Sequence, residues 1–542
     1  MCGIAGILSK SEEDMTSSIK KMLISMQTRG PDGIGLAISN KLLYMNWDAI
    51  KDVRVEHNDV MAHARLAIVG GLKGSQPFTD CNNRIIVEHN GEIYNYKELR
   101  RELGEHKFRT NTDSEVIIHL LEEHYKGDLY QALKIVLKKL DGIFAIVAKD
   151  EKYTALVRDS LGIRQLYYGN NEEMLAFASE KKALWAIEIK NVKRVLPGHI
   201  ILIDNERKEI VKDEKVLEPI RYHERIYDMD NAINAYYNAL IKSMKKRTQD
   251  LDRIGVIFSG GIDSVIIAKL ASEMVGDVRC YCAGLIGSHD IDYSRKIAKA
   301  LGLRLEVNEL TKEDIEELLP DIIETIEETN VGQVEVAIPV YAAIQLASND
   351  GLRVVLSGQG ADELFGGYPW YSKIVESKGY EQFHGYLKND LLLLYKETLE
   401  REDKIAMAHS VEMRVPYLDL EVVSVAMSID PRLKVFKDDR YGKRVHRELA
   451  KRLGIQDNIA YRNKEAAQHG SGIHDVIKEI ARKKYKKHIA NINRIDREPI
   501  GSSQRYGYKF DDEDEWIIDD DLQAYIDYLV LKHGLVNRYE FK

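Results

Sequence analysis

One short stretch, residues 254–258, constrains the second half of this chain more than any other feature. Its sequence, Ile-Gly-Val-Ile-Phe, lacks polar–apolar alternation and is typical of a strand buried on both faces. A glycine-rich segment follows, and residues 264–275 then show a helical pattern. Residues 279–285 predict the next strand and residues 293–301 the next helix. This alternation predicts a parallel sheet with right-handed crossovers, an α/β domain.

The first part of the chain has a different pattern. Short β-rich runs at residues 35–38, 84–87 and 143–147 are separated by turns, and residues 114–124 have helical spacing. We therefore expect antiparallel sheets covered by helices, an α+β layered domain.

The two patterns meet in a charged, aperiodic stretch that contains Pro219. A chain of 542 residues also exceeds what one hydrophobic core supports, so at least two domains are expected. We predict an N-terminal domain over residues 1–205, a linker over 206–228 and a C-terminal domain over 229–542.

Charge and hydropathy limit the partners of this chain. The net charge of -9 argues against a nucleic-acid partner, which would favour a basic patch. No apolar run approaches the roughly 20 residues needed to cross a bilayer. The N-terminus also lacks the basic region and long apolar stretch of a signal peptide. We expect a cytoplasmic protein without a membrane partner.

The four cysteines, Cys2, Cys81, Cys280 and Cys282, form no disulfide framework. Cys280 and Cys282 are too close together for the usual zinc knuckle. Alternate positions of a strand share one face, so we expect this pair to be reduced and buried.

Cys2 follows the initiator methionine and is small enough that the methionine should be removed. The thiol would then lie beside its own α-amine, whose pKa of roughly 7.7 to 8.0 lets it accept the thiol proton near neutrality. One residue would thus supply nucleophile and base. Taken alone, a cysteine at this position is also compatible with chance.

Other side chains supply what a glutamine site requires. Arg65 suits bidentate capture of the α-carboxylate. Asn90 and Gly91 offer an amide and a closely approaching backbone N–H, the parts of an oxyanion hole. Asp113 places an acid for the α-ammonium at a helix start. Taken singly, Arg65 is equally a surface ion pair, and Asp113 or Ser114 a helix cap.

The motifs MCGIAGI, RGPDG, HARLAIV, NGEIYN, TDSE and RDSLGIRQLYY resemble the glutaminase domain of N-terminal-nucleophile amidotransferases. The resemblance covers most of residues 1–200 and implies an αββα-layered fold. It implies that Cys2 is the nucleophile and that Asn90 and Gly91 form the oxyanion hole. The glutamine-binding residues that it implies are Arg65, Leu66, Ala67, Ile68, Val69, Asn90, Gly91, Glu92 and Asp113.

The glycine-rich segment after the buried strand reads Ser-Gly-Gly-Ile-Asp-Ser, residues 259–264. Its glycines let backbone N–H groups face an anion, and the following helix N-terminus adds a positive dipole end. No Gly-Lys-Ser/Thr follows, so this is not the kinase-type phosphate loop. Asp263 indicates a magnesium ion bound jointly with phosphates, whereas an ordinary tight turn is the alternative.

A second strand, residues 354–356, leads to another glycine-rich, acidic turn that contains Asp362. Asp362 is the candidate second magnesium ligand. Lys464 is a candidate cation for charge that develops at an activated acyl centre, although a lysine in a charged stretch is usually only solvated.

Together, SGGIDS, SGQGADELFGGY, AMAHSVEMRVPYLD and Lys464 resemble the synthetase domain of asparagine synthetases, which has an ATP-pyrophosphatase fold. The resemblance implies that ATP and Mg²⁺ convert aspartate to β-aspartyl-AMP and pyrophosphate. Ammonia from glutamine, delivered through an internal passage, then attacks the adenylate. A homodimer is a family expectation. The implied ATP contacts are Phe258, Ser259, Gly260, Gly261, Asp263, Ser264, Ala283, Ser357 and Gly358, and the implied metal ligands are Asp263 and Asp362.

Three positions depart from the family pattern. Gln359 stands where a glutamate is common, and an amide cannot act as a base. Val265 replaces a hydroxyl residue. Counting back from Pro339, Glu335 falls where many relatives have an arginine for aspartate, so a negative charge would face an anionic substrate.

The leading prediction is a glutamine-dependent asparagine synthetase, an AMP-forming carbon–nitrogen ligase. Gln359 and Glu335 favour an alternative in which the same two half-reactions amidate a different carboxylate. A regulatory or binding protein that has lost catalysis is the second alternative, against which Cys2, Asp263 and Asp362 argue.

Overall fold

The change of pattern along the sequence corresponds to a division of the structure. The computed structural model describes residues 2–11, 14–39, 41–70, 74–104, 106–221, 223–437, 441–462, 467–485 and 520–535. The chain divides into two compact units. Unit 1 contains Met1–Glu218 and Met407–Ser410, and unit 2 contains Pro219–Ala406 and Val411–Lys542.

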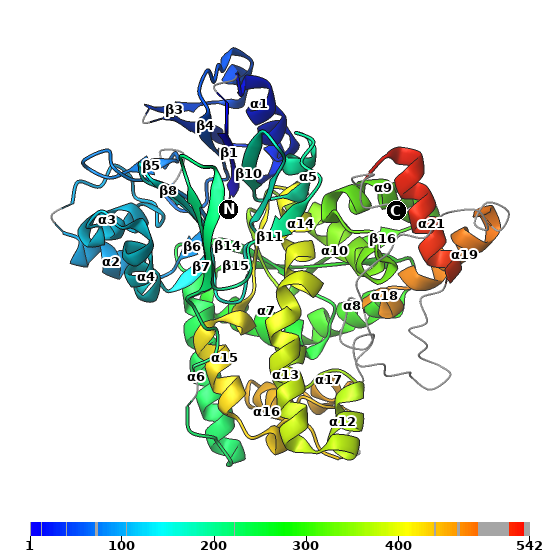
Figure 1. Ribbon diagram of the computed structural model, residues 1–542. Coiled ribbons are helices and arrows are strands. Elements are labelled where there is room, and N and C mark those ends of the chain that lie inside the picture. Colours follow the sequence, from blue (N-terminus) through cyan, green and yellow to red (C-terminus); the bar gives the residue numbers. More distant parts are fainter. Residues whose placement is uncertain are drawn as a thin grey trace. The chain divides into compact units, whose positions relative to one another are not determined.

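Unit 1 is built on two antiparallel sheets (Figure 1). The first has the order β11 (Val192–Arg194), β9 (Tyr167–Asn170), β10 (Met174–Ala178), β1 (Cys2–Ser9), β4 (Asp59–Arg65), β2 (Gly33–Ile38) and β3 (Lys41–Met45). The second has the order β13 (Glu209–Lys215), β12 (His199–Asp204), β8 (Tyr153–Arg158), β7 (Gly142–Lys149), β6 (Ile86–Ile93) and β5 (Phe78–Thr79).

Strand alternation places the apolar residues of the two sheets of unit 1 in a core between the sheets and in two outer cores. Ile4 and Leu8 of β1 belong to the core between the sheets, whereas Ala5 and Ile7 face the other way, because neighbouring strand residues point to opposite faces. The outer cores lie under helices: α1 (Thr16–Ser25) and α5 (Lys181–Trp185) on one side, and α2 (Tyr96–Glu102), α3 (Glu115–His124) and α4 (Leu129–Lys139) on the other. The predicted αββα layering is confirmed.

Unit 2 contains a parallel sheet, as the alternating pattern predicts. Its order is β16 (Arg304–Leu310), β15 (Asp277–Leu285), β14 (Arg253–Ile257), β17 (Val354–Leu356) and β18 (Glu412–Arg414). The helices of its first part are α6 (Met229–Thr248), α7 (Ile262–Met274), α8 (His289–Leu301), α9 (Lys312–Ile326), α10 (Val331–Asn349), α11 (Ala361–Phe365), α12 (Trp370–Lys378) and α13 (Tyr380–Leu394). They are followed by α14 (Glu400–Ala408), α15 (Leu420–Ser428), α16 (Arg444–Arg452), α17 (Asp457–Ala460), α18 (Ala467–Gly470), α19 (Ile473–Tyr485) and α21 (Asp520–His533).

Some boundaries differ from the sequence prediction for local reasons. β6 begins at Ile86 instead of residue 84, because the N–H groups of Arg84 and Ile85 donate to Asp80 Oδ1 and hold a turn. Within the predicted linker, residues 209–215 form β13, which pairs with β12 and exposes most of its charged side chains.

Among the described residues, α10 alone is long and apolar enough to cross a membrane by length and composition. However, 72% of its most apolar window is buried inside the structure. Its burial is that of a core helix, whose apolar surface packs on β14, β15 and β16.

Cys280 and Cys282 are free and buried on β15, as predicted for a strand pair, and Cys81 is the exposed member of the four cysteines. Burial raises the pKa of the Cys280 thiol to about 12 and that of Cys282 to about 11. Both thiols are therefore protonated and unreactive at neutral pH.

A buried ion pair holds the start of β1 in unit 1. Arg29 Nη1 donates to Glu180 Oε1 at 2.8 Å, and Arg29 Nε donates to the carbonyl of Cys2 at 3.2 Å. Burial alone would raise the pKa of Glu180, but the charges of Lys182 and Arg29 outweigh it and lower that pKa. Glu180 is therefore ionised, and removing Arg29 would leave a buried charge without one of its partners.

We predict that Arg29→Met lowers the free energy of unfolding of unit 1 by about 3–5 kcal/mol, the cost of breaking a buried pair. Lys215→Met is the matched control, because Lys215 and Glu218 form an exposed pair worth about 0–1 kcal/mol. Denaturant unfolding of the two variants measures the difference. Equal stability of both variants would contradict the assigned role of Arg29.

Candidate active site

Strand pairing places Cys2 at one end of the space between the two sheets of unit 1. In the β1–β4 register Cys2 lies opposite Arg65, and both side chains are buried. His63 precedes Arg65 by two residues on β4 and so shares its face. From the facing sheet, Asn90 of β6 accepts a hydrogen bond from the Cys2 backbone N–H through Oδ1 at 2.9 Å.

The environment of Cys2 favours the thiolate. Burial alone would raise the pKa of the Cys2 thiol, but the charges of His63 and the amino terminus act in the opposite direction. Hydrogen bonds from His63 and from the Leu66 N–H add to this, and the pKa falls to about 6. At neutral pH Cys2 is therefore mostly a thiolate, the nucleophilic form.

The predicted oxyanion-hole residues lie directly beside Cys2. Asn90 is fully buried, and its Nδ2 has no hydrogen-bond partner among the described residues, so this donor is available to a ligand. Gly91 has φ +153°, and a Cβ built on it would lie 1.9 Å from the carbonyl oxygen of Ile143. A side chain is therefore excluded at this position.

Charged residues of both signs line the same end of unit 1. Burial lowers the pKa of the Arg65 guanidinium, opposed by the charges of Cys2, Asp32 and Asp113. Asp113 Oδ2 accepts a hydrogen bond from the Ile93 N–H at 2.8 Å, which ties the start of α3 to β6. The structure thus brings the Arg65 guanidinium and the carboxylates of Asp32 and Asp113 to the end of unit 1 that holds the thiol.

The remaining glutamine-pocket candidates surround this cluster. Glu92 is buried on β6, and Leu66, Ala67, Ile68 and Val69 directly follow β4. Asp32 Oδ2 accepts the Ala67 N–H at 2.8 Å and holds that segment. A Cβ on Gly74 would lie 2.6 Å from Arg65 Nη2, so the chain passes closely over the guanidinium.

Two residues near Cys2 were not singled out from the sequence. The sequence does contain a pattern that indicates His63: it lies two positions before Arg65, and residues two apart on a strand share one face. No such pattern indicates Glu88: it is fully buried on β6, and neither carboxylate oxygen has a hydrogen-bond partner among the described residues. Burial and the charge of Cys2 raise the pKa of Glu88 well above its ordinary value and so favour its protonated form.

In unit 2 the two predicted glycine-rich turns follow neighbouring parallel strands. The turn before α7 follows β14, and the turn before α11 follows β17, which pairs with β14. A Cβ on Gly358 would lie 3.0 Å from Asp263 Cβ and 3.1 Å from the Ser264 backbone N, so the two turns are in contact. Such a place, at the carboxyl ends of parallel strands, is where open α/β sheets bind ligands.

The predicted ATP contacts gather around these turns. Gly260 has φ +69°, which a glycine adopts without strain, and Ser264 Oγ donates to the Gly261 carbonyl at 3.0 Å. Phe258 and Ser357 are the residues that directly follow β14 and β17. Ala283, on β15, is buried.

The two candidate metal ligands share one cation. Lys443 Nζ lies 2.6 Å from Asp263 Oδ2 and 2.7 Å from Asp362 Oδ1, so both carboxylates point to one place. Burial alone would lower the pKa of Lys443, but the two acids outweigh it and raise that pKa. An oxygen-only pair that converges on a cation fits a magnesium ion. Nothing in the sequence singled out Lys443.

Three further positions bear on the acceptor. Lys464 lies outside the described residues. Gln359 directly follows Gly358 in the second turn. Glu335 is buried and accepts a hydrogen bond from His474 Nδ1 at 2.9 Å, and this hydrogen bond raises the pKa of His474.

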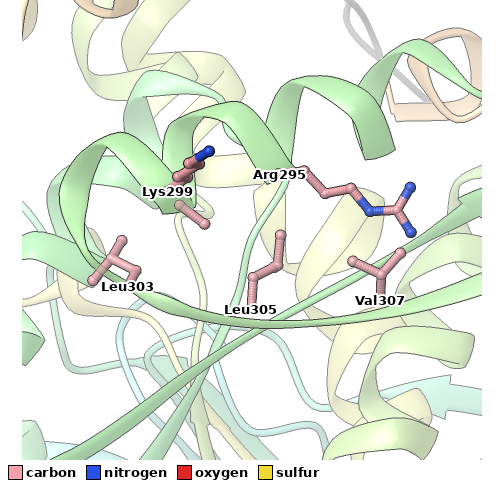
Figure 2. Close-up of a pocket in the computed structure, with 6 residues that line it drawn as sticks. Arg295, Lys299, Leu303, Leu305 and Val307 are labelled. Atoms are coloured by element: carbon pink, nitrogen blue, oxygen red, sulfur yellow. The ribbon is translucent and has the colours of Figure 1, made fainter.

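A surface depression of about 420 Å³ lies between α8 and β16 (Figure 2). Its lining residues are Arg295, Ala298, Lys299, Leu303, Leu305 and Val307. It contains none of the candidate site residues and is separate from both groups described above.

Comparisons with known proteins agree with this division. Residues 1–197 match the glutamine amidotransferase domain model, and residues 235–380 and 375–506 match the asparagine synthase model. A Methanocaldococcus jannaschii protein assigned as asparagine synthetase (glutamine-hydrolyzing) 1 is 37% identical over 534 residues, which cover 89% of this chain and 96% of that protein.

Plant proteins are similar over most of the same length. The nodule asparagine synthetase (glutamine-hydrolyzing) of Pisum sativum is 31% identical over 87% of this chain and 78% of its own. Asparagine synthetase (glutamine-hydrolyzing) 2 of Arabidopsis thaliana is 32% identical over 87% of this chain and 79% of its own. The chain therefore belongs to the glutamine-hydrolysing asparagine synthetases, which are ATP-dependent carbon–nitrogen ligases.

Proposed function

We propose that Cys2 of unit 1 attacks the side-chain amide of glutamine, and that unit 2 uses the released ammonia to amidate aspartate. The observation that carries this proposal is the buried thiol with a pKa of about 6 beside the unpartnered Asn90 Nδ2. A nucleophile and an oxyanion donor are the two groups that amide cleavage requires.

The first half-reaction follows from the residues around Cys2. Arg65 binds the α-carboxylate of glutamine, and Glu92 and Asp113 bind its α-ammonium. The Cys2 thiolate attacks the amide carbon, and Asn90 Nδ2 and the Gly91 N–H stabilise the oxyanion. The C–N bond then breaks, and ammonia leaves with the proton that the Cys2 α-amine had accepted from the thiol, which leaves a thioester on Cys2. Water cleaves this thioester to release glutamate and restore the thiol.

In unit 2 the turns around Gly260 and Gly358 bind the ATP phosphates through backbone N–H groups at the start of α7. Asp263 and Asp362 are the proposed magnesium ligands, and Lys443 balances their charge. The aspartate β-carboxylate attacks the α-phosphorus of ATP, pyrophosphate leaves, and β-aspartyl-AMP forms. When bound, Mg²⁺ would neutralise the phosphate charge in this step. The proposal extends to a cytoplasmic homodimer, on family grounds alone.

A second candidate function differs in the acceptor, the carboxylate that receives the ammonia. Glu335 and Gln359 differ from the family pattern, which favours an acceptor other than aspartate. However, the His474 hydrogen bond compensates the Glu335 carboxylate, so its charge does not act alone on an anionic substrate. We therefore retain aspartate as the proposed acceptor.

Cys2→Ala should abolish glutamine-dependent asparagine formation and leave the ammonia-dependent reaction within about twofold of the unaltered chain, because the ATP site lies in other residues. Cys280→Ala is the control, since it also removes a buried thiol. The measurement is asparagine produced from aspartate with either nitrogen source. Loss of both reactions in Cys2→Ala would contradict the assignment.

The alkylation rate of Cys2 by iodoacetamide should rise with a midpoint near pH 6, because the thiol pKa is lowered to about 6. His63→Ala should move the midpoint upward, since the charge and hydrogen bond of His63 lower this pKa. Peptide mass spectrometry follows the modification at Cys2. A midpoint near the ordinary thiol value of about 8.5 in both proteins would refute this account.

Asp263→Asn and Asp362→Asn should each reduce aspartate-dependent ATP–pyrophosphate exchange by about 10²–10³-fold, the typical cost of removing an electrostatic contact to developing charge. Glutaminase activity should persist. Asp292→Asn, an exposed change in the first turn of α8, is the matched control. Unchanged exchange in Asp263→Asn would exclude it as a magnesium ligand.

A further inference from the structure

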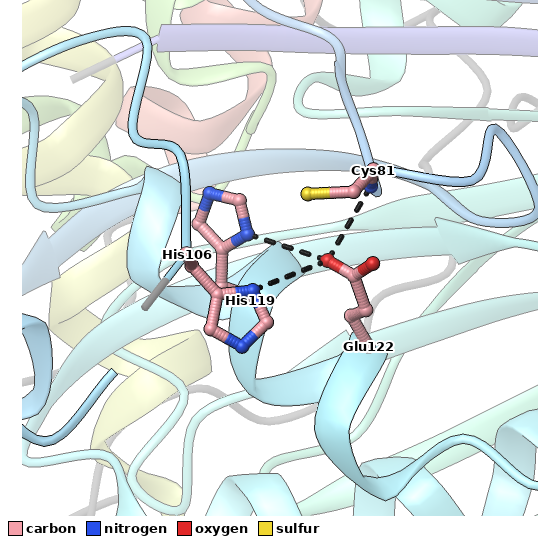
Figure 3. Close-up of side chains that lie close together, drawn as sticks. All are labelled: Cys81, His106, His119 and Glu122. Atoms are coloured by element: carbon pink, nitrogen blue, oxygen red, sulfur yellow. Dashed lines mark hydrogen bonds and ion pairs between the residues drawn. The ribbon is translucent and has the colours of Figure 1, made fainter. Parts of the chain in front are cut away.

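A second cluster of reactive side chains lies in unit 1 and takes no part in the glutamine site. It consists of Cys81, His106, His119 and Glu122 (Figure 3). One ligand atom of each residue lies within 4.8 Å of every other. Cys81 follows β5, His106 lies in the segment after α2, and His119 and Glu122 are on α3. Three separate segments of the domain therefore meet at one point.

The donor atoms are of the kinds that zinc selects. Cys81 offers a sulfur, the two histidines offer imidazole nitrogens, and Glu122 offers a carboxylate oxygen. Zn²⁺ is bound in proteins by these groups, most often by four of them in a tetrahedron. His119 and Glu122 are three residues apart on one helix, a spacing that puts both on the same face.

His119 is buried without the partners that a buried imidazole needs. It is 3% exposed, and neither ring nitrogen makes a hydrogen bond with any described residue. Glu122 Oε2 lies 3.5 Å from Nδ1, and Glu115 Oε1 lies 3.7 Å from Nε2. An unsatisfied buried polar group costs about 1–3 kcal/mol. A ligand bound to the His119 imidazole would remove this cost.

Glu122 is the point on which the other side chains converge. Its Oε2 accepts the Cys81 N–H at 3.3 Å and lies 3.4 Å from His106 Nδ1. Its Oε1 accepts a hydrogen bond from Asn82 Nδ2 at 3.1 Å, which orients the carboxylate. Burial alone would raise the pKa of Glu122, but the hydrogen bonds from Cys81 and the nearby imidazoles of His119 and His106 lower it. Glu122 is therefore ionised at neutral pH.

We propose that Cys81, His106, His119 and Glu122 bind one Zn²⁺ ion through Sγ, one ring nitrogen of each histidine and a carboxylate oxygen. Four protein ligands close the coordination sphere, so the ion is structural. Tetrahedral Zn²⁺ would hold these atoms roughly 3.3–3.7 Å apart. The widest separation of 4.8 Å must therefore close by about 1 Å.

Binding requires that the Cys81 thiol loses its proton. Partial burial, a hydrogen bond with Glu122 and the charge of that carboxylate raise the pKa of this thiol. Metal binding therefore releases the proton to solvent and weakens as the pH falls. The ion would connect α3 to the chain before β6 and to the segment after α2, and so stabilise the helix side of unit 1.

The test is made on the full-length, untagged protein. After dialysis against metal-free buffer, elemental analysis should find about one zinc per chain. Replacement of zinc by Co²⁺ should give a thiolate-to-cobalt charge-transfer band. Cys81→Ser, an exposed change that leaves the fold intact, should remove the band and weaken zinc binding by more than the roughly 10–100-fold typical of outer-shell changes.

Glu122→Gln provides a second variant with the same shape, and it should weaken zinc binding while retaining the cobalt–thiolate band. His223→Ala, at an exposed histidine of unit 2, should change neither readout. The proposal fails if the unaltered protein binds no zinc, or if Cys81→Ser binds it equally well. In the first case the cluster is only a group of histidine–glutamate ion pairs. Glutaminase activity is not a readout, so failure here leaves the proposed function untouched.

Discussion

The pairing of β1 with β4 is the constraint on which the glutaminase unit depends. It sets Cys2 opposite Arg65 and, by strand periodicity, puts His63 on the same face. Because this end lies between two sheets, the charges of the thiolate and the guanidinium are held in a buried place, where their interactions are stronger than in water. The pocket and the low pKa of the thiol both follow from this arrangement.

In unit 2 the candidate site depends on the parallel pairing of β14 with β17. β14 and β17 are neighbours, so the turns at their carboxyl ends touch although they are distant in sequence. The first supplies a helix N-terminus for phosphates, and Asp263 and Asp362 converge on Lys443. The lysine between the two acids keeps their mutual repulsion low, so both carboxylates stay ionised and close together.

The sequence predicts best what depends on short-range patterns. The β14–α7 unit and α3 follow from runs of apolar residues, and each lies within a few residues of its predicted place. Cys2, Arg65, Asn90 and Asp113 were found because their motifs are local.

The contacts that the sequence does not predict join residues that are far apart along the chain. Glu88 enters the Cys2 site only because β6 faces β1, and Lys443 lies 180 residues from Asp263. The four residues of the proposed zinc site come from three segments of the chain. Only His119 and Glu122, both on α3, have a spacing that the sequence reveals. No periodicity within a short window indicates such contacts.

The central claim is that nitrogen from glutamine ends on aspartate through an adenylate. The most direct measurement supplies amide-¹⁵N glutamine, ATP, magnesium and aspartate to the full-length protein and follows the label by mass spectrometry. The account predicts labelled asparagine with one AMP and one pyrophosphate for each molecule formed. Labelled ammonia and glutamate without AMP, or label that appears only on another carboxylate, would contradict it.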